Sequence, residues 1–319
     1  MTGELREGGE QVRRLARLSE RLARSPDLDS LVGTTLAGLA ELFGYEHSLL
    51  LLLDEHGERL YTLGSHGYTS EGVGSEVRVG EGVIGMVAER AEPMRVGNLG
   101  RMLAYARTVR RTYEEQGAEA PGREVPLPGL VDAQSQVAVP AMVLGQLVGV
   151  VVIESATPGA YAPDDEALLT VVATMVASAI EIDWAHERAA GDLVPGDAGA
   201  RRGTPAPRPE TTRVRFFAVD GSTFLDGDYL IKGVAGRVLW VLLGHHEREG
   251  RIEFTNKEVR LDPSLELPEF RDNLESRLIL LKRRLDERDA PIRIEKTGRG
   301  RFRLVVEREL RLECVDGDG

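Results

Sequence analysis

Positively charged side chains gather in one short part of this sequence. Residues 270–303 hold 11 basic and 6 acidic side chains, although the whole chain has a formal net charge of -12. A dense group of Arg and Lys can neutralise phosphates, and an Arg guanidinium can also bind the edge of a guanine base. The same side chains could instead be solvated charges on an arginine-rich protein. The segment is therefore a candidate surface for nucleic acid.

A second group of arginines lies within residues 98–132. The fork of an Arg guanidinium suits the geometry of a phosphate or a carboxylate, so this group could receive an anionic ligand. The alternative is a solvated helix face, because several glutamates stand nearby. No particular ligand follows from the pattern. The four candidates are Arg101, Arg107, Arg110 and Arg111.

The residue types give little support for disulfides, metal sites or catalysis. The single cysteine, Cys314, lies close to a terminal Asp-Gly-Asp-Gly sequence, so disulfides, thiolate zinc sites and a cysteine nucleophile are disfavoured. The histidines of the first 190 residues lack the i, i+4 spacing of a helical metal pair. The sequence also shows no phosphate-binding loop and no Ser/His/Asp motif. We therefore expect a protein that is not an enzyme and that has no cofactor and no metal site.

These residues must be positioned by more than one domain. A chain of 319 residues with 42% hydrophobic content exceeds the usual size of a single compact domain. Residues 1–210 hold 19 basic and 31 acidic side chains, whereas residues 211–319 hold 21 of each, so the net negative charge belongs to the first part. Gly and Pro are dense in residues 191–210, which predicts a flexible linker over 189–212.

The sequence predicts a cytoplasmic protein without a membrane segment. Residues 1–10 lack the apolar region of a signal peptide. The longest apolar stretches, such as 167–180, fall short of the roughly 20 residues that a membrane-spanning helix needs. The low cysteine content also indicates a reducing compartment.

Helical and strand patterns alternate in the first part of the chain. An amphipathic stripe that includes Leu15, Leu18 and Leu22 predicts a helix within residues 1–24, and a second helix follows Asp27 and ends at Gly44. We expect an antiparallel sheet between helices. The strands are predicted at 47–53, 59–63, 76–79, 94–96, 134–144 and 146–154, and a long helix is predicted from 163 to about 188.

Several segments of this part, taken in order, resemble a GAF domain over residues 25–188. They are Gly80-Glu-Gly-Val-Ile-Gly85, Val137-Ala-Val-Pro140, Gly145-Gln-Leu-Val-Gly-Val-Val151 and Tyr161-Ala-Pro-Asp-Asp-Glu-Ala-Leu-Leu169. The Gly-x-Gly-x-x-Gly portion is weak by itself, because it has no Rossmann-like βαβ context. The resemblance implies an α+β fold, an α-β-α sandwich with a central antiparallel sheet. It also implies a helical face that often dimerises and an opposite face that holds a ligand pocket.

The resemblance predicts a sensor. GAF domains respond to cyclic nucleotides, bilins, haem, metal centres or small metabolites, and some are purely structural. Bilin attachment, thiol redox chemistry and methionine-sulfoxide reduction by such domains use cysteines, and residues 25–188 contain none. In this fold the segment 98–132 would cover the ligand face. The ligand itself is not named by the sequence.

The first and last helices of this part could form a homodimer. The helix after residue 163 carries a wide apolar face that includes Leu168, Val172 and Val176, and the N-terminal stripe has the narrower spacing of a helix seam. The alternative is that both helices only cover one side of the sheet. We expect a homodimer with a four-helix interface.

The second part of the chain begins with strands and ends with a hairpin. Alternating runs at 213–219, 222–225 and 228–232 predict a small antiparallel sheet, and apolar residues from Val234 to Leu243 predict a helix. A short strand, a short helix capped by Asn256, and a long helix over about 268–288 follow. The hairpin joins 291–295 to 301–306, and an acidic tail is expected over 309–319.

This order is similar to the response-regulator type of winged helix-turn-helix domain, over residues 213–308. The resemblance rests on Phe224-Leu-Asp-Gly-Asp228, Leu281-Lys-Arg-Arg-Leu285 and Thr297-Gly-Arg-Gly-Arg-Phe-Arg-Leu304. It implies that the third helix enters the major groove of DNA and that the hairpin wing contacts the minor groove or phosphates. The implied DNA-binding residues are Arg271, Asn273 and Arg277 for bases or phosphates, and Lys282, Arg283, Arg284, Arg299, Arg301 and Arg303 for phosphates.

Two features depart from that family. Residues Leu278 to Leu281 are apolar for a full helical turn where small or basic residues are usual, so this helix is either buried on both sides or exposes an apolar patch. A patch would favour a protein partner over groove reading. Gly233 also stands where Ser or Thr would cap the first helix of the domain.

Together these patterns predict a transcriptional regulator in which a GAF sensor controls a winged-helix DNA-binding domain. The alternative is a signalling adaptor whose winged helix binds a protein through residues 278–281 instead of DNA. The expected partners are DNA and a second copy of the chain, with a small-molecule ligand or a protein partner left open.

Overall fold

The computed structural model describes residues 2–68, 72–99, 127–130, 132–193, 211–265 and 274–315. The chain divides into a first unit, Met1–Asp183, and a second unit, Trp184–Gly319. Most of the predicted linker and the segment with Arg101, Arg107, Arg110 and Arg111 lie outside the described residues.

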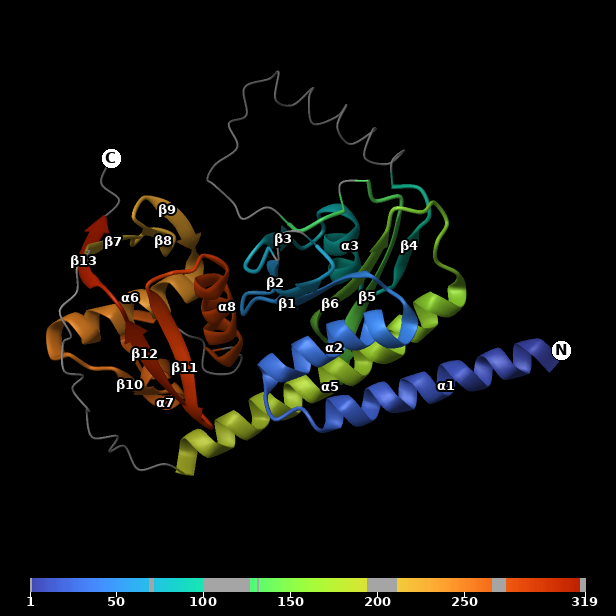
Figure 1. The fold of residues 1–319 in the computed structure, drawn as a ribbon, viewed down its shortest axis with the longest axis horizontal. Helices are drawn as coiled ribbons and strands as arrows, with labels where there is room; N and C mark the ends of the chain where they lie inside the picture. The colour runs from blue at the N-terminus through green and yellow to red at the C-terminus, as the bar shows by residue number, and fades with distance from the viewer. Residues whose placement is uncertain are drawn as a thin grey trace, which may run out of the picture. The chain divides into compact units, whose positions relative to one another are not determined.

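The first unit is built on a six-stranded antiparallel sheet with the strand order β3-β2-β1-β6-β5-β4 (Figure 1). The central strands, β1 (His47–Leu53) and β6 (Gln146–Ser155), are largely buried because elements cover both faces of the sheet. They are flanked by β2 (Arg59–His66) and β5 (Ser135–Val143). The edge strands β3 (Glu76–Arg78) and β4 (Met94–Val96) are short, as is common at sheet edges.

Three helices lie on one side of this sheet: α1 (Thr2–Ala23), α2 (Leu28–Phe43) and α5 (Pro163–Leu193) (Figure 1). Asp27 caps α2 by accepting a 2.9 Å hydrogen bond from the Ser30 N–H, and Gly44 ends the helix in a left-handed conformation. Leu18 of α1 is fully buried against Gly38 of α2, where a Cβ would lie only 2.5 Å from the leucine Cδ1. The glycine therefore sets how closely α1 packs on α2.

One described helix, within Pro163–His186, is long and apolar enough to cross a membrane by length and composition alone. It is 44% buried, and the core helix of a soluble protein meets the same criteria.

The opposite face of the sheet is covered by α3 (Gly82–Arg90). Its Val83 and Val87 pack on Leu49, Leu51 and Val152 in one apolar core. The predicted antiparallel sheet with helices on both faces is confirmed.

The second unit contains a four-stranded sheet of order β13-β7-β8-β9. β7 (Thr211–Phe217), β8 (Ser222–Leu225) and β9 (Asp228–Ile231) are antiparallel neighbours, and β13 (Glu309–Val315) pairs with β7 in parallel. The prediction of an acidic tail over 309–319 is therefore wrong for residues 309–315. Leu310 and Leu312 alternate with charged residues, and Glu313 binds Arg213 of β7 at 2.8 Å, so this acidic segment is held in the sheet.

Helices and a second sheet follow in the order α6 (Gly233–Glu249), β10 (Glu253–Thr255), α7 (Asn256–Arg260) and α8 (Leu274–Glu287). The hairpin of β11 (Ile292–Gly298) and β12 (Arg301–Val306) pairs with β10 in a three-stranded sheet. The predicted cap at Asn256 is wrong by one residue. Thr255 is the N-cap, because its extended backbone lets its hydroxyl accept from the Glu258 N–H while Glu258 reaches back to it.

Candidate functional site

The candidate site of the first unit is a buried carboxylate at one end of the sheet. Glu154, near the end of β6, keeps only 7% of its surface exposed. His47 of β1 and Gln136 of β5 are its register partners on the two neighbouring strands. Alternate residues of a strand point to the same face, so Glu154 shares the α3 face with Val150 and Val152. The polar group thus continues the apolar core on the side opposite α2 and α5.

Among the described residues, the groups that donate hydrogen bonds to this carboxylate are neutral. Gln136 Nε2 donates to Oε1 at 2.8 Å. The Tyr68 hydroxyl and the backbone N–H of Leu130 donate to Oε2 at 3.0 Å and 3.2 Å. Within the described part of the chain, no Arg, Lys or His forms an ion pair with Glu154. A carboxylate in this position is well hydrogen-bonded, and none of the described residues supplies a counter-charge to it.

Aromatic side chains lie near the carboxylate. The His47 and Tyr68 rings meet edge to face with their centroids 5.4 Å apart. Burial, and then the nearby charge of Glu154, raise the pKa of Tyr68 and also that of Tyr161. Both phenols therefore stay protonated and neutral. We call Glu154, His47, Tyr68, Gln136 and Tyr161 the Glu154 cluster.

Sequence reasoning missed this cluster. A single glutamate close to the end of a strand gives no local sign of burial, and its partner Tyr68 is 86 residues away along the chain. The available signal was that His47, Gln136 and Glu154 occupy matching alternate positions in three apolar strands. The predicted ligand candidates Arg101, Arg107, Arg110 and Arg111 lie outside the described residues. Among the residues that the structure does describe, no group of three or more His, Cys, Asp or Glu is arranged to hold a metal ion.

The structure separates the basic residues of the second unit by exposure. Arg277 and Arg284 of α8 are buried, with 8% and 5% of their surfaces exposed. Arg284 Nε donates to the Leu230 carbonyl at 2.8 Å, and its guanidinium forms a 2.6 Å ion pair with Glu287. Burial assigns these two arginines to the packing of the unit, so they are left out of the surface available to a ligand.

The remaining basic candidates differ in how far their side chains are exposed. Arg299 and Arg301, at the β11–β12 turn, are exposed. Arg303 is half-buried and pairs with Glu253 of β10 at 3.3 Å. Lys282 and Arg283 of α8 are half-buried. The predicted residues Arg271 and Asn273 lie outside the described residues.

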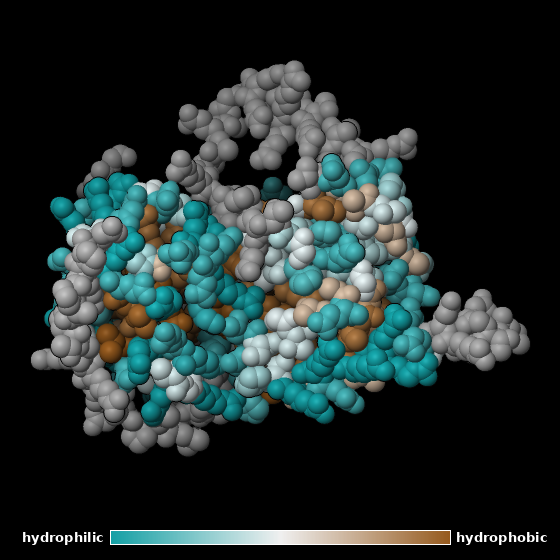
Figure 2. All heavy atoms as spheres, viewed as in Figure 1, coloured by the Kyte–Doolittle hydropathy of each residue, from teal (hydrophilic) through white to brown (hydrophobic). Residues whose placement is uncertain are grey.

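Residues Leu278 to Leu281 are all buried, with between 0% and 6% of each surface exposed. Of the two alternatives left by the sequence, the structure favours the buried helix and shows no exposed apolar patch at these four residues. Figure 2 shows hydrophilic side chains over much of the visible face of the second unit.

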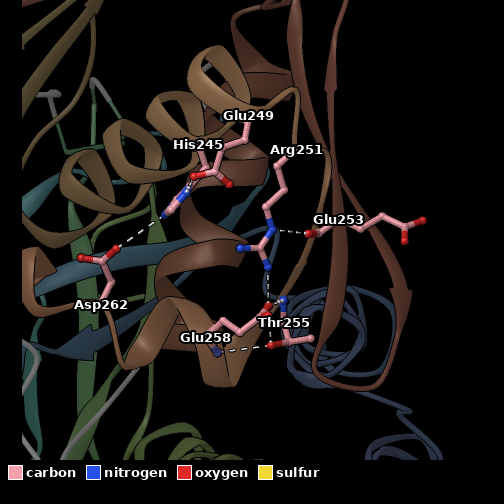
Figure 3. Close-up of polar contacts among 7 residues, drawn as sticks. All are labelled: His245, Glu249, Arg251, Glu253, Thr255, Glu258 and Asp262. Atoms are coloured by element: carbon pink, nitrogen blue, oxygen red, sulfur yellow. Dashed lines mark hydrogen bonds and ion pairs between the residues drawn. The ribbon is translucent and has the colours of Figure 1, made fainter. Parts of the chain in front are cut away.

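A network of charged groups holds α6, β10 and α7 together (Figure 3). The Arg251 guanidinium donates to the Glu253 carbonyl at 3.1 Å and to the Glu258 carboxylate at 2.7 Å, and it lies 4.7 Å from the centre of the Phe254 ring. These contacts join consecutive elements within the unit. They stabilise the scaffold that carries the hairpin and leave little capacity for a ligand.

His245 belongs to the same network and lies between two carboxylates (Figure 3). Its Nδ1 is 3.3 Å from Glu249 and its Nε2 is 3.8 Å from Asp262. Burial acts to raise the pKa of Asp262, but hydrogen bonds from Ser264 and the interaction with His245 outweigh it and lower that pKa below its ordinary value. The pair therefore links the end of α6 to the turn after α7.

Comparison with known proteins assigns a family to one part of the chain. Residues 25–181 match the family model of the GAF domain. A search of curated proteins gives no match.

Solved structures similar to the chain include the GAF domain of a phosphoenolpyruvate-protein phosphotransferase from Coxiella burnetii, with 22% identity, 58% of this chain and 98% of that chain covered, and a TM-score of 0.44. The GAF domain of the corresponding Acinetobacter protein has 22% identity, with 59% and 98% covered and a TM-score of 0.43. Free methionine-R-sulfoxide reductase from Neisseria meningitidis, in complex with its substrate, has 18% identity, with 55% and 91% covered and a TM-score of 0.43.

Proposed function

We propose, from the premise that residues 25–181 form a GAF domain, that this protein is a signal-responsive transcriptional regulator. The GAF domain is a sensor module of signalling proteins. In this proposal it binds the signal, the second unit binds DNA, and the chain catalyses no reaction. The expected location is the cytoplasm.

The order of elements in the second unit supports a winged helix-turn-helix assignment. A small sheet leads into the three helices α6, α7 and α8, and a β-hairpin follows. This is the order implied by the resemblance of the sequence to the response-regulator type, with α8 in the place of the DNA-reading helix. The parallel strand β13 is an addition that the resemblance does not include.

The observation that carries the DNA-binding proposal is the exposure of Arg299 and Arg301 at the hairpin turn. Arg299 lies in the turn and Arg301 begins β12, with Gly300 between them. Exposed guanidiniums on a wing are suited to phosphate contacts, which depend strongly on salt because they release counterions.

Salt-dependent binding of the full chain to genomic DNA fragments tests this proposal. Replacing both Arg299 and Arg301 with Ala should reduce the slope of log affinity against log salt by about 2, because each phosphate contact contributes about 1. The matched control replaces Arg24 and Arg90, two exposed arginines of the first unit, and should leave the slope unchanged. An unchanged slope in the hairpin variant, or no DNA binding at low salt, would reject the proposal.

The adaptor alternative has lost the feature that favoured it. It required an exposed apolar patch at residues 278–281, and those four side chains are buried. We therefore retain DNA binding as the proposed role of the second unit.

We also propose that the protein acts as a homodimer through α1 and α5. Large apolar side chains remain exposed on these helices, at Val12, Val171 and Ile182, with 66%, 47% and 57% of their surfaces accessible. Both helices lie on the same side of the sheet (Figure 1). Pairing with a second copy would bury these side chains.

Sedimentation equilibrium tests the dimer. The wild type should have twice the chain mass of 34.9 kDa at micromolar concentration. Replacing Val171 and Ile182 with Asp should produce monomers, whereas Leu144→Asp at the β5–β6 turn should not, although Leu144 is 97% exposed. A wild type that sediments as a monomer rules out the dimer.

A further inference from the structure

We infer that the first unit recognises an organic cation, such as a protonated amine or a guanidinium, at the carboxylate of Glu154. The inference rests on the proposed sensor function and adds the chemical class of the ligand.

Within the part of the chain that the structure describes, the Glu154 cluster holds no positively charged partner for its carboxylate. Glu154 is almost fully buried, and its three hydrogen-bond donors are an amide, a phenol and a backbone N–H. A carboxylate offers about four acceptor positions, so roughly one is left for another donor. A buried charge is costly without an opposite charge nearby, and a cationic ligand would supply one.

Arg95, which contacts the backbone of Tyr161, already has an acidic partner. Arg95 donates to the Tyr161 carbonyl at 3.1 Å and lies 3.4 Å from Glu166 at the start of α5. Its ion-pair partner is therefore Glu166, and no contact between Arg95 and Glu154 is present. The negative charge of the cluster stays available on the α3 face of the sheet.

The aromatic rings suit the same class of ligand. Tyr68 presents its ring to His47, and its hydroxyl is committed to Glu154, so the ring stands directly beside the carboxylate. Cations are attracted to the face of an aromatic ring as well as to an anion. The raised pKa of both Tyr68 and Tyr161 keeps these phenols neutral, so they add no competing charge.

Exposure indicates the side from which a ligand would approach. His47 and Tyr68 are half-buried, whereas Glu154 and Tyr161 are buried. A cationic group would reach the carboxylate past the His47 and Tyr68 rings. The core beyond them is filled by α3, so the charged end of the ligand, and not a long apolar body, has to supply most of the binding energy.

Three small probes with four carbon atoms each test this inference on the full-length protein. They are butylammonium, butanol and butyrate, which carry a positive, a neutral and a negative head group. Probes of this size bind at about millimolar concentration, which suits chemical-shift titration of backbone amides. Butylammonium should shift the amides of Gln136, Glu154 and Ser155, and the other two probes should not.

A charge-removing variant locates the effect. Glu154→Gln should weaken butylammonium binding by at least about tenfold, because it removes the charge that the ammonium would meet. Glu81→Gln makes the same charge change at an exposed residue of the same unit that caps no backbone N–H, and should bind like the wild type. If Glu154→Gln does not fold, the order of the three probes on the wild type still decides.

The inference is overturned if butanol or butyrate binds as well as butylammonium, if no probe binds, or if Glu154→Gln and the wild type bind butylammonium equally. DNA binding by the same preparations is measured separately. Loss of the salt-dependent DNA signal would remove the proposed regulator, whereas loss of the probe signal alone would remove only the ligand class.

Discussion

In the first unit the group of interest is a buried charge, whereas in the second unit the groups of interest are charges at the surface. Glu154 is 7% exposed and accepts hydrogen bonds from neutral donors in β5 and in two loops. Arg303 keeps 41% of its side chain exposed and forms an ion pair with Glu253 on the neighbouring strand β10. Burial raises the energetic importance of each partner of Glu154, while solvent screens the pair at Arg303.

The contrast shows that counting charges in a sequence overstates the charge available for binding. Residues 270–303 have a positive excess, but the structure pairs Arg284 with Glu287 and Lys296 with Glu275. Conversely, the first unit is acidic overall, but a count of charges does not show that one of its carboxylates, Glu154, is buried. Exposure and partners decide which charges can reach a ligand.

The largest expected effect on stability comes from removing the buried carboxylate of Glu154. Glu154→Ala removes the acceptor of the Gln136 amide, the Tyr68 hydroxyl and the Leu130 N–H at once. Leaving buried donors unsatisfied costs about 1–3 kcal/mol each, partly relieved by water, so the free energy of unfolding of the first unit should fall by roughly 2–4 kcal/mol. Native-state hydrogen exchange of β5 and β6 amides measures this loss.

The control for that loss is Glu81→Ala, which changes the same charge on an exposed side chain. It should alter the exchange of the same amides by less than about 0.5 kcal/mol. Equal effects of the two substitutions would mean that Glu154 is not the buried hydrogen-bond centre described above.

The next largest effect separates the two classes of arginine within the second unit. Arg284→Ala leaves the Leu230 carbonyl and Glu287 without their partner, so it should destabilise the second unit by about 1.5–3 kcal/mol. Arg301→Ala, at an exposed position, should change stability by less than about 0.5 kcal/mol. Hydrogen exchange of α8 and β9 amides distinguishes the two variants. If Arg284→Ala and Arg301→Ala lower the free energy of unfolding equally, burial does not distinguish these two arginines.

Local sequence patterns predicted most elements of both units, because helices and strands are marked by apolar spacing and flanking turn residues within the element itself. The strands at 47–53, 94–96 and 222–225 have the bounds expected from their apolar residues and flanking turns. The errors arose where distant residues decide the outcome. β13 forms because β7, about a hundred positions earlier, offers it an edge, and Glu154 is buried by donors from β5, from a loop and from Tyr68.

Candidate binding residues were harder to predict than elements. Arg299 and Arg301 fall in a turn, where an exposed side chain is the usual outcome. Arg277 and Arg284 flank the apolar turn Leu278 to Leu281 of α8, and charge alone does not indicate that a long side chain there will be buried. Arg284 has two partners, and they belong to different elements. The Leu230 carbonyl lies in β9 and Glu287 lies in α8.

A smaller effect is expected for an exposed ion pair of the second unit. Arg303 and Glu253 face each other at paired positions of β12 and β10, with a 3.3 Å contact and partial exposure. A double-mutant cycle with both residues changed to Ala should give a coupling energy of about 0.2–1 kcal/mol. The coupling should shrink when the salt concentration rises, because exposed pairs are screened. A coupling above about 2 kcal/mol would place this pair with the buried interactions.

The smallest expected effect is a pH dependence at Asp262. Its pKa in the folded protein is lowered from the ordinary value of 3.8, so the unfolded state binds more protons as the pH falls toward that value. The stabilising contribution is therefore fully present above 3.8 and is lost as the pH falls through the folded-state pKa. Asp262→Asn should reduce the free energy of unfolding at pH 6 by more than it does at pH 3.

Urea denaturation of both proteins at the two pH values, followed by fluorescence of Trp240 in a Trp184→Phe background, measures the difference. Asp286→Asn, at an exposed position of α8, is the matched control and should give the same small change at both pH values. If the Asp262→Asn difference is also independent of pH, the hydrogen bonds from Ser264 and the contact with His245 do not hold Asp262 in its charged form. The surface network of the second unit would then contribute to stability through shape and packing, with charge having little part in it.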